Sequence, residues 1–222
     1  GVGLEIKGEF FLDKQEFDAK KDKCLLQCLL AGALCNNSVL KRGGVDIAGL
    51  WRKKGCGWAV EGDPTEGALV VAAAKAGIWR ADVEKKERRL GEIPFEAERR
   101  RMAVAYSGPE GPVLYVKGAP DTVLELCRYY YDGTRAQPLT PELAARIAAA
   151  NEAMTGEALR VLAMAFRKIT AAEAAGLGDA AEQELVFIGL AGMIDPPRAE
   201  AREAVAVCRQ AGIRTVMITG DH

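Results

Sequence analysis

Apolar residues along this chain recur with two periods, one typical of helices and one typical of strands. Helical spacing covers residues 21–36, and the segment Asp63-Pro64-Thr65-Glu66 has the residues of a helix start, with an N-cap, a proline and a capping-box glutamate. The first 20 residues alternate weakly and are expected to form one or two edge strands. Further along, we expect strands over 90–95, 102–107, 113–117 and 159–166, and helices over 120–127 and 140–154.

The pattern changes near the C-terminal end of the chain. An apolar strand over 185–193, a helix over 198–211 and a second apolar strand over 213–219 predict a strand-helix-strand unit of a parallel sheet. Two adjacent prolines interrupt this unit, and because they fix φ they exclude regular structure there. We therefore expect one domain over 1–193, a second partial domain over 194–222, and a hinge formed by Asp195, Pro196, Pro197 and Arg198.

Charge and hydropathy limit the kinds of partner that this chain is expected to bind. The 30 Lys and Arg residues are balanced by 31 Asp and Glu residues, so no overall field attracts nucleic acid or an anionic membrane surface. The longest apolar run, 185–194, is far shorter than the roughly 20 residues that cross a bilayer. We expect neither a nucleic-acid partner nor a membrane segment nor a signal peptide in this chain.

The six cysteines are best interpreted as reduced thiols. Cys24, Cys28 and Cys35 fall on one face of the first helix, where free cysteine behaves as a small buried hydrophobe. The single histidine, His222, leaves no ordinary zinc ligand set, so we expect no metal site. A thiol-based metal or interaction domain built on these three cysteines stays open as an alternative.

Familiar catalytic motifs are absent from the sequence. It contains no P-loop and no dinucleotide-binding glycine motif. With one terminal histidine and no serine in an elbow sequence, a Ser/His/Asp hydrolase is also excluded.

Seven short segments together resemble, in type and order, the cytoplasmic nucleotide-binding domain of P-type cation-transporting ATPases, most closely calcium pumps and their bacterial relatives. Each segment alone is weak, but the seven cover nearly the whole chain. They are Ala33-Leu34-Cys35-Asn36-Asn37-Ser38, Gly62-Asp63-Pro64-Thr65-Glu66-Gly67-Ala68-Leu69, Pro94-Phe95 ahead of Arg99-Arg100-Arg101-Met102, Val116-Lys117-Gly118-Ala119-Pro120, Leu159-Arg160-Val161-Leu162-Ala163, Asp195-Pro196-Pro197-Arg198 and Met217-Ile218-Thr219-Gly220-Asp221-His222.

The resemblance implies an α+β fold with an antiparallel sheet of six or seven strands flanked by helices, followed by a partial α/β, HAD-like phosphorylation-domain unit. It implies that the chain binds ATP, with Mg²⁺, for phosphoryl transfer to an aspartate that this sequence lacks. We therefore expect a soluble cytoplasmic fragment of an integral membrane ATPase. Its expected partners are the remaining phosphorylation, actuator and transmembrane domains, and its expected cargo is calcium, with another cation as the alternative.

The resemblance also assigns site residues. Phe95, which follows a proline at a strand end, becomes the platform on which adenine stacks; without the resemblance it could equally be a core residue. Thr65 and Glu66 lie beside the adenine in the family, although Glu66 is also explained by the capping box. The remaining assignments are Lys117 and Gly118 to the pocket wall, Arg160 to the phosphates, Leu162 to the base, and Thr219, Gly220 and Asp221 to support of the phosphoryl group.

Lys117 and Arg160 also have explanations of their own in the sequence. The glycine after Lys117 permits close approach of the backbone to a ligand. Arg160 stands among apolar strand residues, where a guanidinium requires an anion or a carboxylate.

One position departs from the family pattern. Calcium pumps commonly carry an arginine two residues after the stacking aromatic, and this sequence has Ala97 there. Either Arg99 to Arg101 compensate, or this basic run is a solvated face. We expect weak ATP binding, with a dissociation constant on the order of 0.1 to 1 mM.

Two further expectations follow from the missing nucleophile. A non-catalytic adenine-nucleotide sensor or regulatory module is the alternative function. The strand-helix-strand unit lacks a neighbouring strand, so we expect residues 194–222 to be poorly ordered or to self-associate with another copy.

Overall fold

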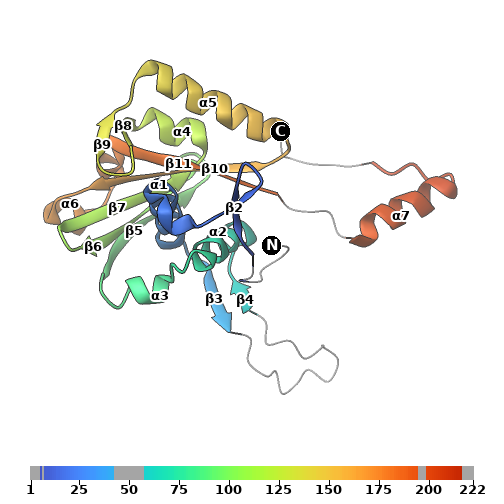
Figure 1. Ribbon diagram of the computed structural model, residues 1–222, viewed down its shortest axis with the longest axis horizontal. Coiled ribbons are helices and arrows are strands. Elements are labelled where there is room, and N and C mark those ends of the chain that lie inside the picture. The colour runs from blue at the N-terminus through green and yellow to red at the C-terminus, as the bar shows by residue number, and fades with distance from the viewer. Residues whose placement is uncertain (1–5, 7, 43–57, 195–198, 217–222) are drawn as a thin grey trace.

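The computed structural model describes residues 6, 8–42, 58–194 and 199–216. Its helices and strands follow one another in the order shown in Figure 1. The strands are β1 (Phe10–Leu12), β2 (Gln15–Phe17), β3 (Val39–Arg42), β4 (Trp58–Glu61), β5 (Arg89–Glu96), β6 (Arg101–Gly108), β7 (Gly111–Gly118), β8 (Cys127–Tyr131), β9 (Ala136–Pro138), β10 (Arg160–Lys168) and β11 (Leu185–Met193). The helices are α1 (Lys23–Leu34), α2 (Pro64–Lys75), α3 (Arg80–Val83), α4 (Pro120–Glu125), α5 (Pro141–Gly156), α6 (Ala171–Ala175) and α7 (Ala199–Gln210), with short 3-10 helices η1 (Ala19–Lys21) and η2 (Asp179–Glu182).

Seven strands form the central sheet, in the order β5-β6-β7-β10-β11-β8-β9. Every pairing is antiparallel except that of β11 with β8, so the expectation of a wholly antiparallel sheet is wrong at this pair. The chain enters β11 from η2 in the same direction as β8, and β11 fills the position between β10 and β8. The expected α+β class and the strand count are confirmed.

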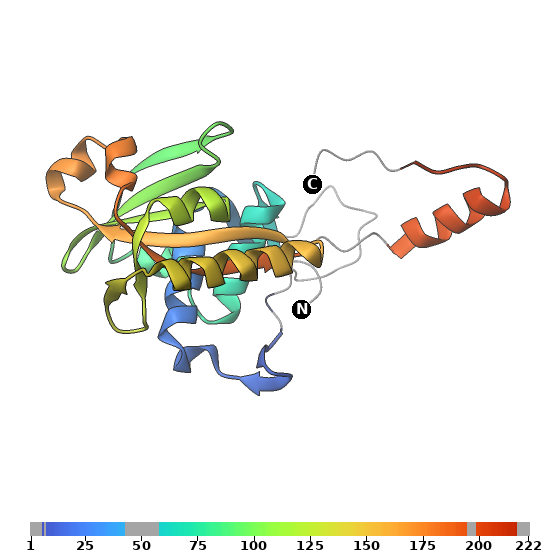
Figure 2. The same ribbon diagram turned by 90° about the horizontal axis from the view of Figure 1, so that it is seen from above.

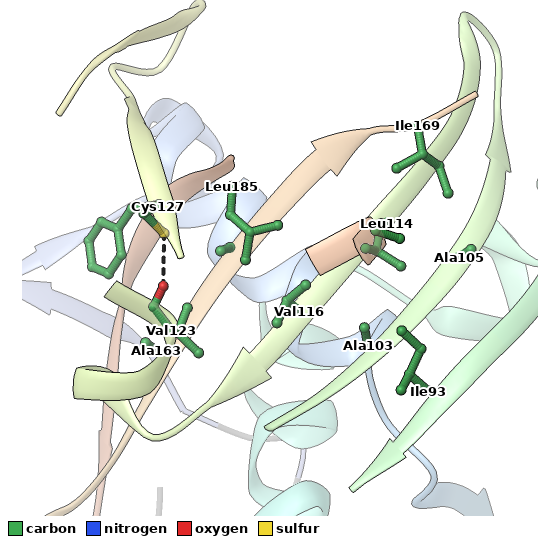
Figure 3. Packing of buried hydrophobic residues seen from close by; sticks show 13 residues of the cluster. Ile93, Ala103, Ala105, Leu114, Val116, Val123, Cys127, Ala163, Ile169 and Leu185 are labelled. Atoms are coloured by element: carbon green, nitrogen blue, oxygen red, sulfur yellow. Dashed lines mark hydrogen bonds between the residues drawn. The ribbon is translucent and has the colours of Figure 1, made fainter. Parts of the chain in front are cut away.

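Helices cover both faces of this sheet (Figures 1 and 2). One face, the α1 face, packs alternate strand residues against α1 and α2; they include Met102, Val104, Tyr106, Tyr115 and Met164. The other, the α4 face, packs the intervening strand residues, among them Ala103, Ala105, Leu114 and Val116 in Figure 3, against α4, α5 and α6. Because both faces are covered, β6 reads as a nearly continuous apolar run.

Helix starts follow local capping chemistry. The Asp63 carboxylate accepts hydrogen bonds from the backbone N–H groups of Thr65 (2.8 Å) and Glu66 (3.1 Å) at the start of α2. Thr140 caps α5 in the same way through Leu143 N–H, and Pro141 follows it at the first helical position. These two helices begin where the sequence predicts.

The sequence also predicts strands at the start of the chain and a strand-helix-strand unit at its end. The first 20 residues supply two strands, as expected, and within the described residues β1 and β2 pair with one another in a separate two-stranded sheet. The helix expected over 198–211 is present as α7, which lies apart from the sheet (Figures 1 and 2). Residues 213–216 form no strand, and the remainder of the expected second strand, 217–219, lies outside the described residues.

Candidate functional site

The start of α2 is connected to the sheet by two side-chain bonds. Lys117 Nζ on β7 donates to Glu66 Oε1 at 2.6 Å, and the Arg160 guanidinium on β10 donates to Thr65 Oγ1 at 2.9 Å. Because β7 and β10 are neighbours in the sheet, both bonds lie at the same end of it. Four of the residues predicted from the sequence therefore meet, although 95 positions separate Thr65 from Arg160.

The Glu66–Lys117 ion pair is largely buried. The Lys117 side chain is 6% exposed and the Glu66 side chain 16% exposed. An ammonium at this depth requires a compensating charge, and Glu66 supplies it. The second carboxylate oxygen of Glu66 accepts from Asn37 N–H at 3.0 Å. The expectation that Glu66 completes a capping box is wrong, because its carboxylate turns away from the helix start and toward β7.

Asn36 holds the ends of α1 and α2 together. Its side chain is fully buried, and its amide donates to the carbonyl oxygens of Gly32 (3.0 Å) and Glu66 (2.8 Å). Its side-chain oxygen accepts from Ser38 N–H at 2.8 Å. The Asn36-Asn37 pair therefore places both the backbone and the carboxylate of Glu66. From the sequence, this segment supported the family resemblance and the end of the first helix and was given no part in the site, although a pair of asparagines directly after a helix was the available signal.

Two neighbouring titratable groups have shifted pKa values. Partial burial raises the pKa of Asp63, but hydrogen bonds from Glu66 and Thr65 and the charge of Arg160 outweigh it, so the pKa lies below its ordinary value. Burial raises the pKa of the Cys35 thiol to about 12, and its Sγ donates to the carbonyl oxygen of Met102. Asp63, the N-cap of α2, is therefore ionised at neutral pH, whereas the Cys35 thiol is not.

Phe95 lies on β5 at the edge of the sheet and is 62% exposed. Ile93 pairs with Ala103 and Glu96 with Arg101, so two residues of β5 stand opposite the single residue Met102. This bulge changes the alternation of side chains. From this bulge we infer that Phe95 lies on the α1 face, the face that carries Met102 and Lys117.

Leu162 and Gly118 lie on opposite faces of the sheet. Leu162 is partly buried on the α1 face, packed with the core cluster there. A Cβ on Gly118 would lie 2.5 Å from Arg101 Cβ and 2.6 Å from the carbonyl oxygen of Arg100. The backbone that Gly118 approaches is therefore that of Arg100 and Arg101, and its place in the wall of a nucleotide pocket stays a prediction.

The basic run after Phe95 is bound to carboxylates. Arg99 and Arg101 contact the buried Glu182, and Arg100 donates to Asp121 at 2.5 Å and to Thr122 Oγ1 at 2.8 Å. The Arg99 and Arg101 side chains are only 12% and 13% exposed, so their interpretation as a solvated face is wrong. Their engagement with Glu182 also argues against compensation for Ala97.

The remaining predicted site residues are those of the hinge and of the phosphoryl-group support. The hinge residues Asp195 to Arg198, and Thr219, Gly220 and Asp221, lie outside the described residues. Within the described ranges, no group of three or more His, Cys, Asp and Glu side chains is arranged to hold a metal ion. The same ranges contain no helix of the length and apolarity needed to cross a membrane.

Two surface hollows lie elsewhere on the molecule. One, of about 610 Å³, separates the β1–β2 hairpin from the end of α2, and one of about 530 Å³ lies between α1 and α3. None of the residues predicted to contact nucleotide lines either hollow. The candidate site is instead the surface around Phe95 and the start of α2.

Comparison with known sequences identifies similar proteins over the whole chain. The family described as "P-type ATPase, cytoplasmic domain N" matches residues 24–200. A calcium-transporting ATPase of Bacillus subtilis is 41% identical over 224 residues, covering 100% of this chain and 24% of that relative. A cation-transporting ATPase of Synechocystis is 40% identical over 232 residues, with 100% and 24% covered. A sodium/potassium exporting P-type ATPase of Schizosaccharomyces pombe is 40% identical over 168 residues, with 74% and 16% covered. The chain thus spans about a quarter of the length of the first two relatives.

Proposed function

Since the chain belongs to the family of P-type ATPase cytoplasmic N domains, we propose that it binds ATP on the α1 face, beside the start of α2. The purine stacks on Phe95, and the phosphates extend along the sheet toward Arg160. The domain positions ATP and carries no nucleophile of its own.

The observation that carries this proposal is the exposure of Phe95 at the edge of the face that buries Lys117. A 62% exposed phenylalanine offers an open ring to a base, and stacking of a base on such a ring is worth about 1 to 3 kcal/mol. Two strands away on the same sheet, the Glu66–Lys117 pair offers both an acceptor and donors, because the Glu66 bond uses one of the three ammonium donors. An apolar stacking surface with a few fixed polar groups is typical of a nucleotide site.

The other residues have supporting roles in this proposal. Thr65 holds the Arg160 side chain by its hydroxyl, which orients the guanidinium at the phosphate end. Leu162 supplies apolar surface beneath the base, and Gly118 keeps β6 and β7 close enough for Lys117 to face Phe95. Mg²⁺ enters bound to the phosphate oxygens of ATP, which it prefers as ligands and whose charge it partly neutralises.

We further propose that the chain is part of a longer ATPase that couples ATP hydrolysis to cation transport. The relatives named as calcium-transporting and cation-transporting ATPases support this parent, with calcium as the proposed cargo. In that protein the γ-phosphate of ATP is transferred to an aspartate of another domain, with Thr219 to Asp221 beside it and Asp195 to Arg198 as the hinge. These names lend no support to the sensor alternative.

Titration of the 222-residue chain with ATP, followed by NMR, tests the proposal. We expect a dissociation constant of about 0.1 to 1 mM. We expect the largest shifts at Thr65, Glu66, Phe95, Lys117 and Arg160. Shifts confined to other surfaces would refute the assigned site.

A matched pair of variants sharpens this test. Phe95→Ala should raise the dissociation constant about tenfold or more, because the stack is lost. Phe11→Ala removes an equally exposed phenylalanine, 61% against 62%, from the β1–β2 hairpin and should leave binding unchanged. Equal effects of the two substitutions would contradict the proposed pose.

A further inference from the structure

Glu182 is a fully buried carboxylate that contacts two arginines from a distant part of the chain. It lies at the end of η2 and is 0% exposed, and its Oε2 accepts from Arg101 Nε at 2.8 Å and from the Arg99 guanidinium. Its other oxygen, Oε1, has no hydrogen-bond partner among the described residues. A buried carboxylate is tolerated only with compensating charge, so Glu182 and the two arginines are energetically tied to one another.

The two arginines stand on either side of Arg100, the last residue of the turn between β5 and β6. In this turn Arg100 has φ +49°, a left-handed conformation that is unfavourable for residues other than glycine. Its N–H donates to Glu96 O at 2.8 Å, and its carbonyl oxygen accepts from Ala119 N–H at 2.9 Å. The turn therefore keeps a strained residue while Glu182 binds the side chains on either side of it.

Phe95 depends on this turn for its position. Its exposed ring makes too little contact to fix itself, so the bulge before Glu96 and the turn after it set its direction. Arg99 also reaches back to the Pro94 carbonyl oxygen at 3.5 Å, next to Phe95 in the chain. A side chain on the α4 face is in this way connected to the orientation of a ring on the α1 face.

We propose that Glu182 is a positioning residue for nucleotide binding, which holds the β5–β6 turn so that the Phe95 ring faces Lys117. This inference rests on the proposed function. Glu182 does not touch the nucleotide and acts on it through Arg99, Arg101 and Phe95.

Glu182→Gln tests the inference because it removes the charge and nearly keeps the shape. In the nucleotide-free chain, we expect hydrogen exchange to accelerate at residues 97–101 and to stay unchanged on α5. The dissociation constant for ATP should rise about tenfold, since a misplaced ring loses much of its overlap with the base. Asp179→Asn is the matched control: it removes a 73% exposed carboxylate that pairs with the same Arg99, and should change neither readout.

A double-variant cycle separates positioning from a general loss of structure. If Glu182 acts through the ring, Glu182→Gln adds no loss of ATP affinity in the Phe95→Ala background. Additive losses, or unchanged exchange and affinity in folded Glu182→Gln, would overturn the inference. Should Glu182→Gln not fold, Arg101→Gln keeps the Arg99–Glu182 pair and must show the same two changes to a smaller extent.

The same titrations distinguish the two proposals. If Phe95→Ala weakens ATP binding and Glu182→Gln does not, only the positioning role fails. If the unmodified chain shows no ATP-dependent shifts at Phe95 or Lys117, the proposed function fails, and the exchange experiment still reports on the turn.

Discussion

Each face of the sheet buries a carboxylate against basic side chains. Two of the basic residues that pair with these carboxylates, Lys117 and Arg101, lie at the same end of the sheet, in neighbouring pairs of the β6–β7 ladder. Lys117 pairs with Met102 in the β6–β7 ladder, and the neighbouring pair is Arg101 with Gly118. On the α1 face, Glu66 is bonded through both oxygens and keeps 16% exposure. On the α4 face, Glu182 is sealed and keeps one oxygen without a partner in the described part of the chain.

The comparison distinguishes two roles of a buried ion pair, one in ligand binding and one in holding the chain in place. An ion pair at a partly open edge can exchange bonds with a ligand at modest cost, because water and ligand reach it. A sealed ion pair cannot, and it serves to hold segments of the chain in place. Glu66 and Glu182, close in space, illustrate the two cases.

The largest expected effect is on stability, at the sealed pair. Glu182→Gln should lower the free energy of unfolding by about 3–5 kcal/mol, because two arginines lose their compensating charge. Glu66→Gln should cost less, about 2–3 kcal/mol, because the Lys117 ammonium loses its compensating charge but the amide oxygen at this partly open edge still accepts a hydrogen bond from it. Urea denaturation followed by circular dichroism measures both, and a larger loss for Glu66→Gln would reverse the comparison.

A smaller effect is expected at the asparagine that supports the open pair. Asn36→Ala removes three hydrogen bonds, two to the carbonyl oxygens of Gly32 and Glu66 and one from Ser38 N–H, so the free energy of unfolding should fall by about 2 kcal/mol. ATP binding should weaken as well, because Glu66 is displaced. Asn37→Ala serves as the control: Glu66 accepts from the Asn37 backbone N–H, which the substitution keeps. Equal losses of ATP affinity in the two variants would contradict the placing role of the Asn36 side chain.

The smallest effect concerns pH, at the cap of α2. The folded-state pKa of Asp63 lies below the ordinary value of 3.8, so its contribution to stability is present above that pH and is lost as the pH falls toward the folded-state pKa. Asp63→Asn keeps a capping oxygen without the titration. Below pH 4, the variant should lose less stability on acidification than the unmodified chain, as measured by urea denaturation at each pH. Parallel curves for both proteins would show that Asp63 does not contribute.

Local features were predictable from the sequence. The helix start at Asp63-Pro64, the strands predicted over 102–107 and 113–117 and the helix predicted from residue 140 all depend on neighbouring residues, and each appears where predicted. The sequence allowed Phe95 to be either exposed or part of the core, because a proline at a strand end does not determine on which face of the sheet the next side chain lies. The β5 bulge settles its direction through pairing with β6.

Long-range features were not predictable. The parallel pairing of β11 with β8 depends on which gap in the sheet remains for the last strand. The direction of the Glu66 carboxylate depends on Lys117, 51 positions away. Glu182 lies 83 positions from Arg99 and stands in a polar segment, where a glutamate ordinarily faces water, so no local pattern marked it as buried.

The position of β11 also governs when this domain can assemble. The last strand of the sheet to leave the ribosome is an interior one, between β10 and β8. Until residue 193 has been synthesised, β10 and β8 each present an unpaired edge, which invites pairing with other chains. We expect the nascent domain to acquire its native sheet late and as one unit, and truncations that end before Leu185 to aggregate.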